Sequence, residues 1–292
     1  NNPPSLGDYE VVKFAQGFSS IRQRSSGEIM HSVNKPVEEA ERLYVGQSYL
    51  ANRLIRRADD DAEMVIWDVG LGAATNAMAA VHCFEKALAE NGADKLRSLR
   101  LISFECDLDP LTLACRDNSN FLYLRHSAPH HILRHGRWQH NSQLLTWELL
   151  KGDFLELFWK APIPDLIFYD PFSAKTDSEL WTAETFSLLF KNLAERKVEL
   201  YTYSAATAVR VAMLRAGFFV AEGMATGPKA ATTIAFNKIE GAGEHPQKPP
   251  LLDARWLERW RRSGSRFPST ASHHEKEQIT AAIESHPQFN MG

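Results

Sequence analysis

Residues 63–75 have the sequence EMVIWDVGLGAAT, an apolar run that leads into an aspartate and two glycines. The run from Glu63 to Asp68 predicts a buried strand. Small and apolar residues recur at helical spacing over Asn76–Glu90, which predicts a helix. The connection between them is short and contains Gly70 and Gly72. A strand, a glycine turn and a helix in this order form the opening unit of a β/α fold.

The alternation of strands and helices continues along the chain. Further strands are predicted at Leu99–Glu105, Leu144–Leu150, Asp165–Tyr169, Val198–Tyr203, Phe218–Ala225 and Thr232–Asn237. Helices are predicted at Pro110–Asn118, Trp181–Asn192 and Ala205–Ala216, the last closed by Gly217. We therefore expect an α/β protein with a doubly wound, mostly parallel sheet of about seven strands, whose ligands bind at the C-terminal strand ends.

Changes in composition along the sequence predict three regions. An N-terminal segment, 1–60, leads into the core and packs on it; 61–239 is the α/β core; 240–292 is a C-terminal extension with a helical tail. The 292 residues are 44% hydrophobic and carry a formal net charge of -3, which excludes a polycation that coats nucleic acid nonspecifically. Three cysteines without CxxC spacing exclude a disulfide scaffold. No signal peptide and no apolar run of membrane-spanning length is present, so we expect a cytoplasmic protein without a membrane partner.

The glycine turn favours one kind of nucleotide ligand. Gly70 and Gly72 allow a tight turn, and the following helix offers its N-terminal amides. A dinucleotide fingerprint has a third glycine where Thr75 stands, and Asp68 has the wrong charge for a pyrophosphate. The charge of Asp68 suits the ammonium and sulfonium of S-adenosylmethionine (SAM). Another nucleotide, or a purely structural turn, remains open at this point.

Two further acidic residues follow predicted strands. Glu105 ends the second strand, where α/β nucleotide sites hold ribose hydroxyls, although capping of the next helix is an alternative. Asp153 follows the third strand, where it would lie near an adenine amino group, or would only belong to a turn.

The fourth predicted strand ends in Asp170-Pro171-Phe172. This stretch is similar to the D-P-P-Y pattern of amino-group methyltransferases, in which a carboxylate accepts a hydrogen bond from the target amine and an aromatic ring stacks on the base. Methyl transfer from a sulfonium requires a neutral, oriented amine, and a carboxylate offsets the charge that the amine gains. The alternative is a strand-ending turn.

Together, these acidic strand ends and the glycine turn resemble the class I SAM-dependent methyltransferases. More narrowly, DPFSAK at 170–175 and ELWT at 179–182 resemble the D-G-F-x-P-x-K-N-P-x-M-W-T stretch of MnmC-type methyltransferase domains. The segment 38–45 resembles the E-E-x-x-x-V-F-L stretch of that family, and 209–218 its V-R-x-x-L-x-x-A-G-F stretch. The resemblance covers about residues 30 to 236 and includes nothing like an FAD-dependent oxidase domain.

The resemblance implies a stand-alone tRNA-modifying enzyme with SAM as its cofactor. It would convert 5-aminomethyl-2-thiouridine at the tRNA wobble position into 5-methylaminomethyl-2-thiouridine, after an oxidase or another precursor-forming enzyme has acted. The implied roles of the residues are these: the methionine end of SAM at Asp68, Gly70 and Gly72, the ribose at Glu105, the adenine at Asp153, the amine at the catalytic Asp170, and the acceptor at Phe172 and Trp181.

Departures from the family pattern fall on the acceptor side. Pro171 replaces a glycine, Ala174 a proline, and the Asn-Pro pair after Lys175 is absent; the segment 227–231 is also less basic than in the family. A methyltransferase for a small-molecule or protein amine is therefore an alternative, as is a SAM-binding module without turnover. NADH binding without SAM binding would indicate a dehydrogenase instead.

Clusters of cations and aromatics offer sites for RNA. They are Arg53, Arg56 and Arg57; the segment 134–138 (RHGRW); and the segment 255–262 (RWLERWRR). In the last of these, Trp256, Leu257 and Trp260 have the spacing of a helix that docks on the core, which would leave the arginines as a solvated face. A histidine-rich run over 126–140 lacks paired carboxylates or cysteines, so we expect no metal site there.

Overall fold

The computed structural model describes residues 3–30, 35–57, 61–226, 231–264, 266–268 and 270–290. Contacts divide the chain into two units, Asn1–Phe172 and Ser173–Gly292. No helix within the described ranges is both long enough and apolar enough to span a bilayer. The predicted boundaries near residues 60 and 240 remain a prediction.

Apart from three N-terminal strands, the described part of the first unit contains five strands in the order β8-β4-β5-β7-β6. Their bounds are Met64–Val69 (β4), Leu99–Glu105 (β5), Arg137–Gln139 (β6), Leu145–Lys151 (β7) and Leu166–Tyr169 (β8). Strands β8, β4, β5 and β7 pair in parallel, and β6 pairs antiparallel with β7. The parallel order brings the C-terminal ends of β4, β5 and β8 to one edge, because the neighbouring strands run in the same direction.

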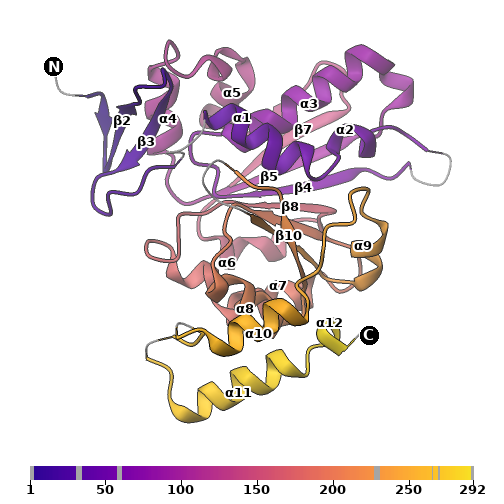
Figure 1. Ribbon diagram of the computed structural model, residues 1–292. Helices are drawn as coiled ribbons and strands as arrows, with labels where there is room; N and C mark the ends of the chain where they lie inside the picture. Colours follow the sequence, from indigo (N-terminus) through magenta and orange to yellow (C-terminus); the bar gives the residue numbers. More distant parts are fainter. Residues whose placement is uncertain are drawn as a thin grey trace. The chain divides into compact units, whose positions relative to one another are not determined.

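Helices flank these strands. They are α1 (Pro36–Ala40), α2 (Leu50–Arg53), α3 (Thr75–Asn91), α4 (Asp109–Arg116), α5 (Ser127–His135) and α6 (Phe154–Leu157). A π-helix spans Glu41–Gly46 (η1), and single 3-10 turns lie at Ala93–Lys95 (η2), Leu122–Arg125 (η3) and Phe158–Lys160 (η4). Figure 1 shows α1, α2 and α3 on the same side of β4 and β5.

Strand β4 lies at the centre of this unit, and all six of its residues are buried. Trp67 is in edge-on contact with Phe104 and Phe154, and its indole Nε1 donates to the Pro162 carbonyl at 3.0 Å. Because the polar atom of this large side chain is satisfied, its burial is favourable. The central strand is thereby fixed between aromatic neighbours, and its C-terminal end is held in place.

The N-terminal residues form a separate antiparallel sheet, which the sequence did not predict. Its strands are β1 (Ser5–Leu6), β2 (Tyr9–Lys13) and β3 (Ser19–Gln23). Tyr9, Val11 and Ile21 are buried, and β2 packs on α4.

The second unit contains three antiparallel strands in the order β10-β11-β9. They are Glu199–Thr202 (β9), Phe219–Gly223 (β10) and Thr232–Phe236 (β11). Its helices are α7 (Ala183–Asn192), α8 (Thr207–Ala216), α9 (Ile239–Glu244), α10 (Ala254–Arg262), α11 (His273–Glu284) and α12 (Pro287–Asn290), with a single turn at Ser178–Trp181 (η5). Gly217 caps α8 with a φ of 106°, as predicted.

The α/β alternation is confirmed, with one correction. The sequence predicted about seven strands for the α/β sheet. Eight strands, β4 to β11, occur there among the described residues. The additional strand is β6, a three-residue segment that folds back on β7 through the turn after His140. A strand this short and half-exposed has no apolar run to reveal it.

Candidate active site

Asp68 is a fully buried carboxyl group near the C-terminal end of β4. Its Oδ2 accepts a hydrogen bond from the Ser103 hydroxyl at 2.7 Å, and Ser103 Oγ in turn accepts one from the indole of Trp147 at 2.9 Å. Its Oδ1 is buried and has no hydrogen-bond partner among the described residues. Burial raises the pKa of Asp68 to about 8, and the nearby charges of Asp170 and Glu105 act in the same direction.

The glycine turn packs against the end of β8. Gly70 has a φ of 88°, and a Cβ built on it would lie 2.7 Å from the carbonyl oxygen of Asp170. Any side chain at this position would clash with backbone, so Gly70 is required by the close approach of the Asp170-Pro171 segment. A Cβ on Gly72 would lie 3.1 Å from Sδ of Met30. The two glycines therefore serve close packing on both sides of the turn.

Glu105 closes the turn from the end of β5. Its Oε2 accepts a hydrogen bond from the Gly72 amide and its Oε1 one from the Asp107 amide, both at 3.0 Å. Burial raises the pKa of Glu105, and these hydrogen bonds act in the opposite direction. The amide of Asp109, the first residue of α4, donates to Oδ1 of Asp107 at 2.9 Å, so the capping role that was the alternative for Glu105 is filled by Asp107.

Asp170 follows β8 directly. Its Oδ2 accepts a hydrogen bond from the side-chain nitrogen Nδ2 of Asn76 at 2.6 Å, and Asn76 belongs to the first turn of α3. Phe172 lies beside Tyr9 of β2, with nearly parallel rings whose centroids are 6.5 Å apart. Glu105 and Asp170 thus lie close enough to Asp68 to make its ionisation less favourable.

The other two predicted site residues have different surroundings. Asp153 is exposed, and its Oδ1 accepts a hydrogen bond from the Leu155 amide at 2.8 Å, which caps α6. Trp181 belongs to the second unit, where it is buried at η5 with its ring edge-on to Tyr203 at 6.1 Å. The structure therefore brings together Asp68, Glu105 and Asp170 with their two glycines, and Asp153 caps α6.

Sequence reasoning missed two polar partners of this cluster and the aromatic partner of Phe172. Ser103 lies opposite Asp68 in the register of β4 and β5, and a lone serine in the apolar run LRLISFE is the signal that could have found it. Asn76 and Tyr9 carry no such signal, because each meets its partner across a long stretch of sequence.

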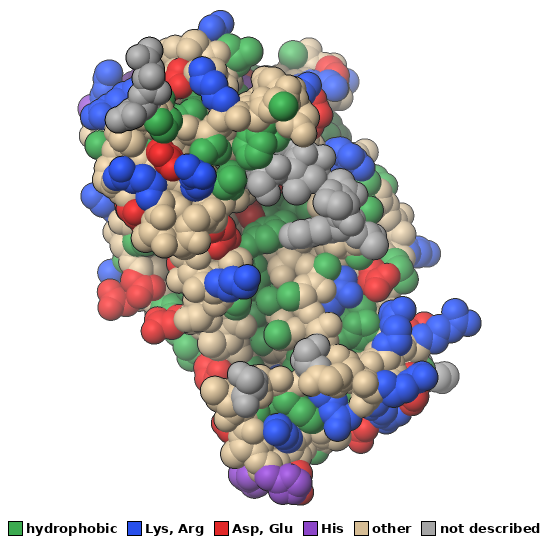
Figure 2. Space-filling model, turned by 60° about the vertical axis from the view of Figure 1, so that its left-hand side comes forward, with side chains coloured by type: hydrophobic (Ala, Val, Ile, Leu, Met, Phe, Trp, Pro, Cys, Tyr) green, Lys and Arg blue, Asp and Glu red, His purple; other side chains and the backbone are tan. Residues whose placement is uncertain are grey.

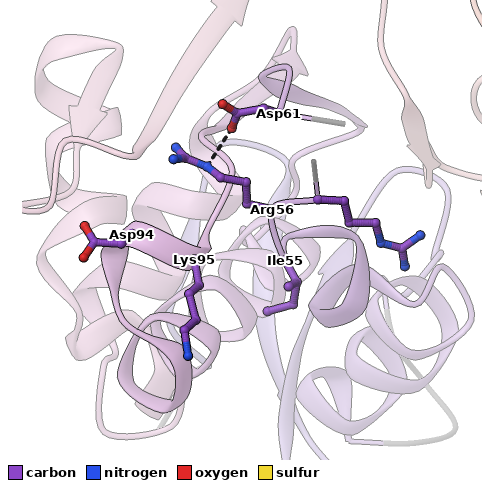
Figure 3. Close-up of a pocket in the computed structure, with 6 residues that line it drawn as sticks. Ile55, Arg56, Asp61, Asp94 and Lys95 are labelled. Carbon is purple, nitrogen blue, oxygen red and sulfur yellow. Dashed lines mark ion pairs between the residues drawn. The ribbon is translucent and has the colours of Figure 1, made fainter. Parts of the chain in front are cut away.

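A hollow lies near the N-terminal ends of the parallel strands, at the other end from Asp68, Glu105 and Asp170. Its volume is about 370 Å³, and Figure 3 shows its lining side chains with the Arg56–Asp61 ion pair of 2.7 Å. It is lined by Ile55, Arg56, Arg57, Asp61, Asp94 and Lys95. Met64 and Leu99 begin β4 and β5 next to these segments, so this hollow is remote from the carboxylate edge.

The basic clusters divide into paired and exposed cations. In α10, Trp256, Leu257 and Trp260 are buried and Arg255, Arg259 and Arg262 are exposed, which confirms the docking interpretation of the tryptophans. Figure 2 shows Lys and Arg side chains gathered in the lower part of the view, where α10 lies. In the histidine-rich run, His126 pairs with Glu85 at 2.9 Å. No group of three or more potential metal ligands occurs among the described residues.

Comparisons with known proteins identify the chemistry. Residues 117–238 match a family model described as S-adenosyl-L-methionine-dependent methyltransferase. The fold is similar to MnmC2 from Aquifex aeolicus, with a TM-score of 0.66 and 22% identity over 97% of this chain and 85% of that one. The chain is a SAM-dependent methyltransferase. A probable spermidine synthase from Corynebacterium glutamicum ATCC 13032 is also similar, with a TM-score of 0.48 and 13% identity over 91% of this chain and 94% of that one. No curated protein matches the sequence.

The residues of this methyltransferase fit a cationic cofactor. A buried carboxyl oxygen without a hydrogen-bond partner is costly, and Oδ1 of Asp68 is in this situation. A ligand with an ammonium and a sulfonium group supplies a hydrogen-bond donor for this oxygen. It also supplies positive charge to offset the negative charges of Asp68, Glu105 and Asp170. The class I fold and the SAM cofactor that the sequence predicted are thus confirmed, and the roles of individual residues are proposals.

Proposed function

We propose that this methyltransferase methylates the primary amine of an aminomethyl group on the tRNA wobble uridine. The reaction would convert 5-aminomethyl-2-thiouridine into 5-methylaminomethyl-2-thiouridine. The observation that carries the proposal is the oriented carboxylate of Asp170, held by Asn76 next to the glycine turn and two residues before Phe172. The DPFSAK and ELWT stretches, and the similarity to MnmC2 over nearly the whole chain, support the same acceptor.

SAM, when bound, supplies an electrophilic methyl group. The amine lone pair would take up this methyl group in a new N–C bond, and the electrons of the broken C–S bond would remain on the S-adenosylhomocysteine product. Asp170 accepts a hydrogen bond from the amine, directs its lone pair and offsets the positive charge that develops on nitrogen. The surplus proton then passes to solvent. Asn76 donates to Oδ2 of Asp170 and so limits rotation of the carboxylate.

SAM is bound by acidic residues at the ends of β4 and β5 and at the start of α6. Asp68 and the turn at Gly70 and Gly72 hold the methionine end, Glu105 the ribose hydroxyls and Asp153 the adenine. Phe172 stacks near the acceptor ring, and Trp181 supports the segment that follows it. The enzyme would act in the cytoplasm on tRNA that another enzyme has already supplied with the aminomethyl group.

The decisive experiment is mass spectrometry of tRNA nucleosides from a strain that lacks the gene. We expect the unmethylated aminomethyl nucleoside to accumulate, and purified enzyme with SAM to convert it. An unchanged nucleoside profile would remove the tRNA assignment. Asp170→Asn should abolish transfer while calorimetric SAM binding persists; SAM binding by the wild type with no turnover on any tRNA would instead indicate a binding module.

A further inference from the structure

The glycine turn continues past Gly72 into a strained stretch before α3. Ala74, the residue that precedes the helix, has a φ of 62°, in the left-handed region where a residue with a Cβ is uncommon. Its side chain is fully buried, and alanine has no polar group with which to cap the first amides of α3. The conformation of this part of the turn therefore depends on its neighbours.

Tyr123, in η3, takes part in two hydrogen bonds at this place. Its hydroxyl donates to the Ala73 carbonyl at 2.9 Å and lies 3.1 Å from the hydroxyl of Thr75, the first residue of α3. A phenol has one proton, and Tyr123 gives it to Ala73, so the Thr75 hydroxyl is the donor in the second hydrogen bond. Burial raises the pKa of Tyr123, which keeps this proton on the phenol. One side chain thus holds the turn on both sides of Ala74.

The peptide unit between Ala73 and Ala74 is fixed at both of its polar atoms. Its carbonyl accepts the hydrogen bond from Tyr123, and its amide, that of Ala74, donates to the Leu71 carbonyl at 2.7 Å. Because a peptide unit is planar, these two hydrogen bonds determine its orientation. Without the phenol hydroxyl, rotation of this plane would return Ala74 towards a negative φ and relieve its strain. The hydroxyl of Tyr123 therefore opposes relaxation of the turn.

The ring and the hydroxyl of Tyr123 have separate roles. The ring lies edge-on to the buried ring of Phe121, with centroids 6.4 Å apart. A phenylalanine would keep this packing and lose both hydrogen bonds to the turn. The hydroxyl therefore acts on the conformation of the turn rather than on the packing of η3.

We propose that Tyr123 is a positioning residue for the methionine end of the donor, acting through Ala73 and Thr75 on the glycine turn. The inference rests on the proposed role of that turn in holding the methionine end of SAM. It concerns the donor alone, so it holds whichever amine accepts the methyl group.

The test compares two ligands that differ in the amino-acid end. S-adenosylhomocysteine carries the α-amino and α-carboxyl groups, whereas 5′-methylthioadenosine keeps the adenosine and the thioether without them. Calorimetry measures the affinity of the full chain for each. Tyr123→Phe should weaken binding of S-adenosylhomocysteine about 3- to 10-fold, the effect of losing one hydrogen bond. It should leave binding of 5′-methylthioadenosine within about twofold, because that ligand has no group for the turn to hold.

Substitutions of Thr75 approach the same contact from the helix. Thr75→Val removes the hydroxyl and should show the same selective loss, whereas Thr75→Ser keeps it and should bind both ligands as the wild type does. A Thr75→Ser variant as weak as Thr75→Val would contradict the role of the hydroxyl. Tyr201→Phe is the matched control in the second unit: it removes a buried hydroxyl that donates to Oε2 of Glu199, and it should change neither affinity.

Asp68→Asn, measured at pH 8, separates the possible failures. It should weaken binding of S-adenosylhomocysteine and not of 5′-methylthioadenosine, since only the first carries the ammonium group. If it does so and Tyr123→Phe does not, the role of Tyr123 is refuted and the placement of the methionine end stands. If Asp68→Asn affects both ligands alike, that placement is refuted and the inference with it. Equal loss for both ligands in Tyr123→Phe means a structural role only and overturns the inference. None of these measurements involves tRNA, so the proposed acceptor is tested separately.

Discussion

The proposed contact between SAM and the buried carboxyl of Asp68 predicts that SAM binding depends on pH. Because the pKa of Asp68 is about 8 in the ligand-free protein, most of these molecules carry a protonated Asp68 at pH 7. A bound cation stabilises the ionised form and lowers that pKa. Binding then releases a proton below pH 8, so affinity must rise with pH.

The size of the effect follows from the ionised fraction. Well below pH 8 that fraction grows about tenfold per pH unit, which corresponds to about 1.4 kcal/mol of binding free energy per unit. Between pH 5.5 and pH 7 we therefore expect the dissociation constant to fall by at least about tenfold, even if part of the dependence is lost to neighbouring groups. The α-amino group of the ligand, with a reference pKa of about 7.7–8.0, remains mostly charged over this interval.

Calorimetry in buffers of different ionisation enthalpy measures both the affinity and the number of protons released. Asp68→Asn, which is isosteric with the protonated acid, is the matched variant and should bind SAM with little dependence on pH. The same substitution should raise the melting temperature of the ligand-free protein by clearly more at pH 8.5 than at pH 5.5. The sign follows because a carboxyl whose folded pKa is raised destabilises the native state as pH increases from its unfolded pKa to about 8. A flat wild-type profile, or an equal slope in the variant, would refute the reasoning.

Three further predictions concern other parts of the molecule. Asn76→Ala should lower kcat at least about tenfold with little change in SAM affinity, because it releases the carboxylate of Asp170; a loss confined to SAM binding in calorimetry would contradict this. Gly70→Ala should destabilise the protein in urea by at least about 2 kcal/mol more than Gly17→Ala, since both have positive φ but only Gly70 faces backbone within 4 Å; equal losses would show that strain alone matters. Replacing the exposed arginines of α10, which are Arg255, Arg259 and Arg262, by glutamine should weaken tRNA binding and reduce its salt dependence by up to about three charges. Arg261→Gln is the control, because Arg261 is already paired with Glu258 and Glu284. Gel-shift titrations at several salt concentrations would show no change in slope if this face does not touch RNA.

The strands of the first unit were predictable because buried parallel strands are short apolar runs bounded by polar turns. The prediction Leu99–Glu105 coincides with β5, and Asp165–Tyr169 is one residue longer than β8. The N-terminal sheet was missed because its strands are short, and in the YEVVK sequence of β2 buried residues alternate with half-buried ones. Such alternation over five residues competes poorly with the polar residues around it.

The sequence predicted which strand ends carry the acidic residues of the site, but not the hydrogen-bond partners of those side chains. Topology places the ends of β4, β5 and β8 side by side, so the grouping of Asp68, Glu105 and Asp170 follows from strand order. Their hydrogen-bond partners depend on register and on rotamers, which composition does not encode. The less basic segment at 227–230, which bears on the acceptor, lies outside the described residues.

The energetic pattern of the cluster separates a structural role from a functional one. A carboxyl group with one unpartnered, fully buried oxygen stabilises nothing by itself, and two neighbouring acids make its ionisation harder still. A leucine or asparagine at position 68 would cost less to bury, and the hydrogen bond from Ser103 offsets only part of the cost. Departures from local stability of this kind are expected where a ligand supplies the missing partner. A positively charged ligand at the end of β4 would explain this arrangement, and the proposed methyl donor is such a ligand.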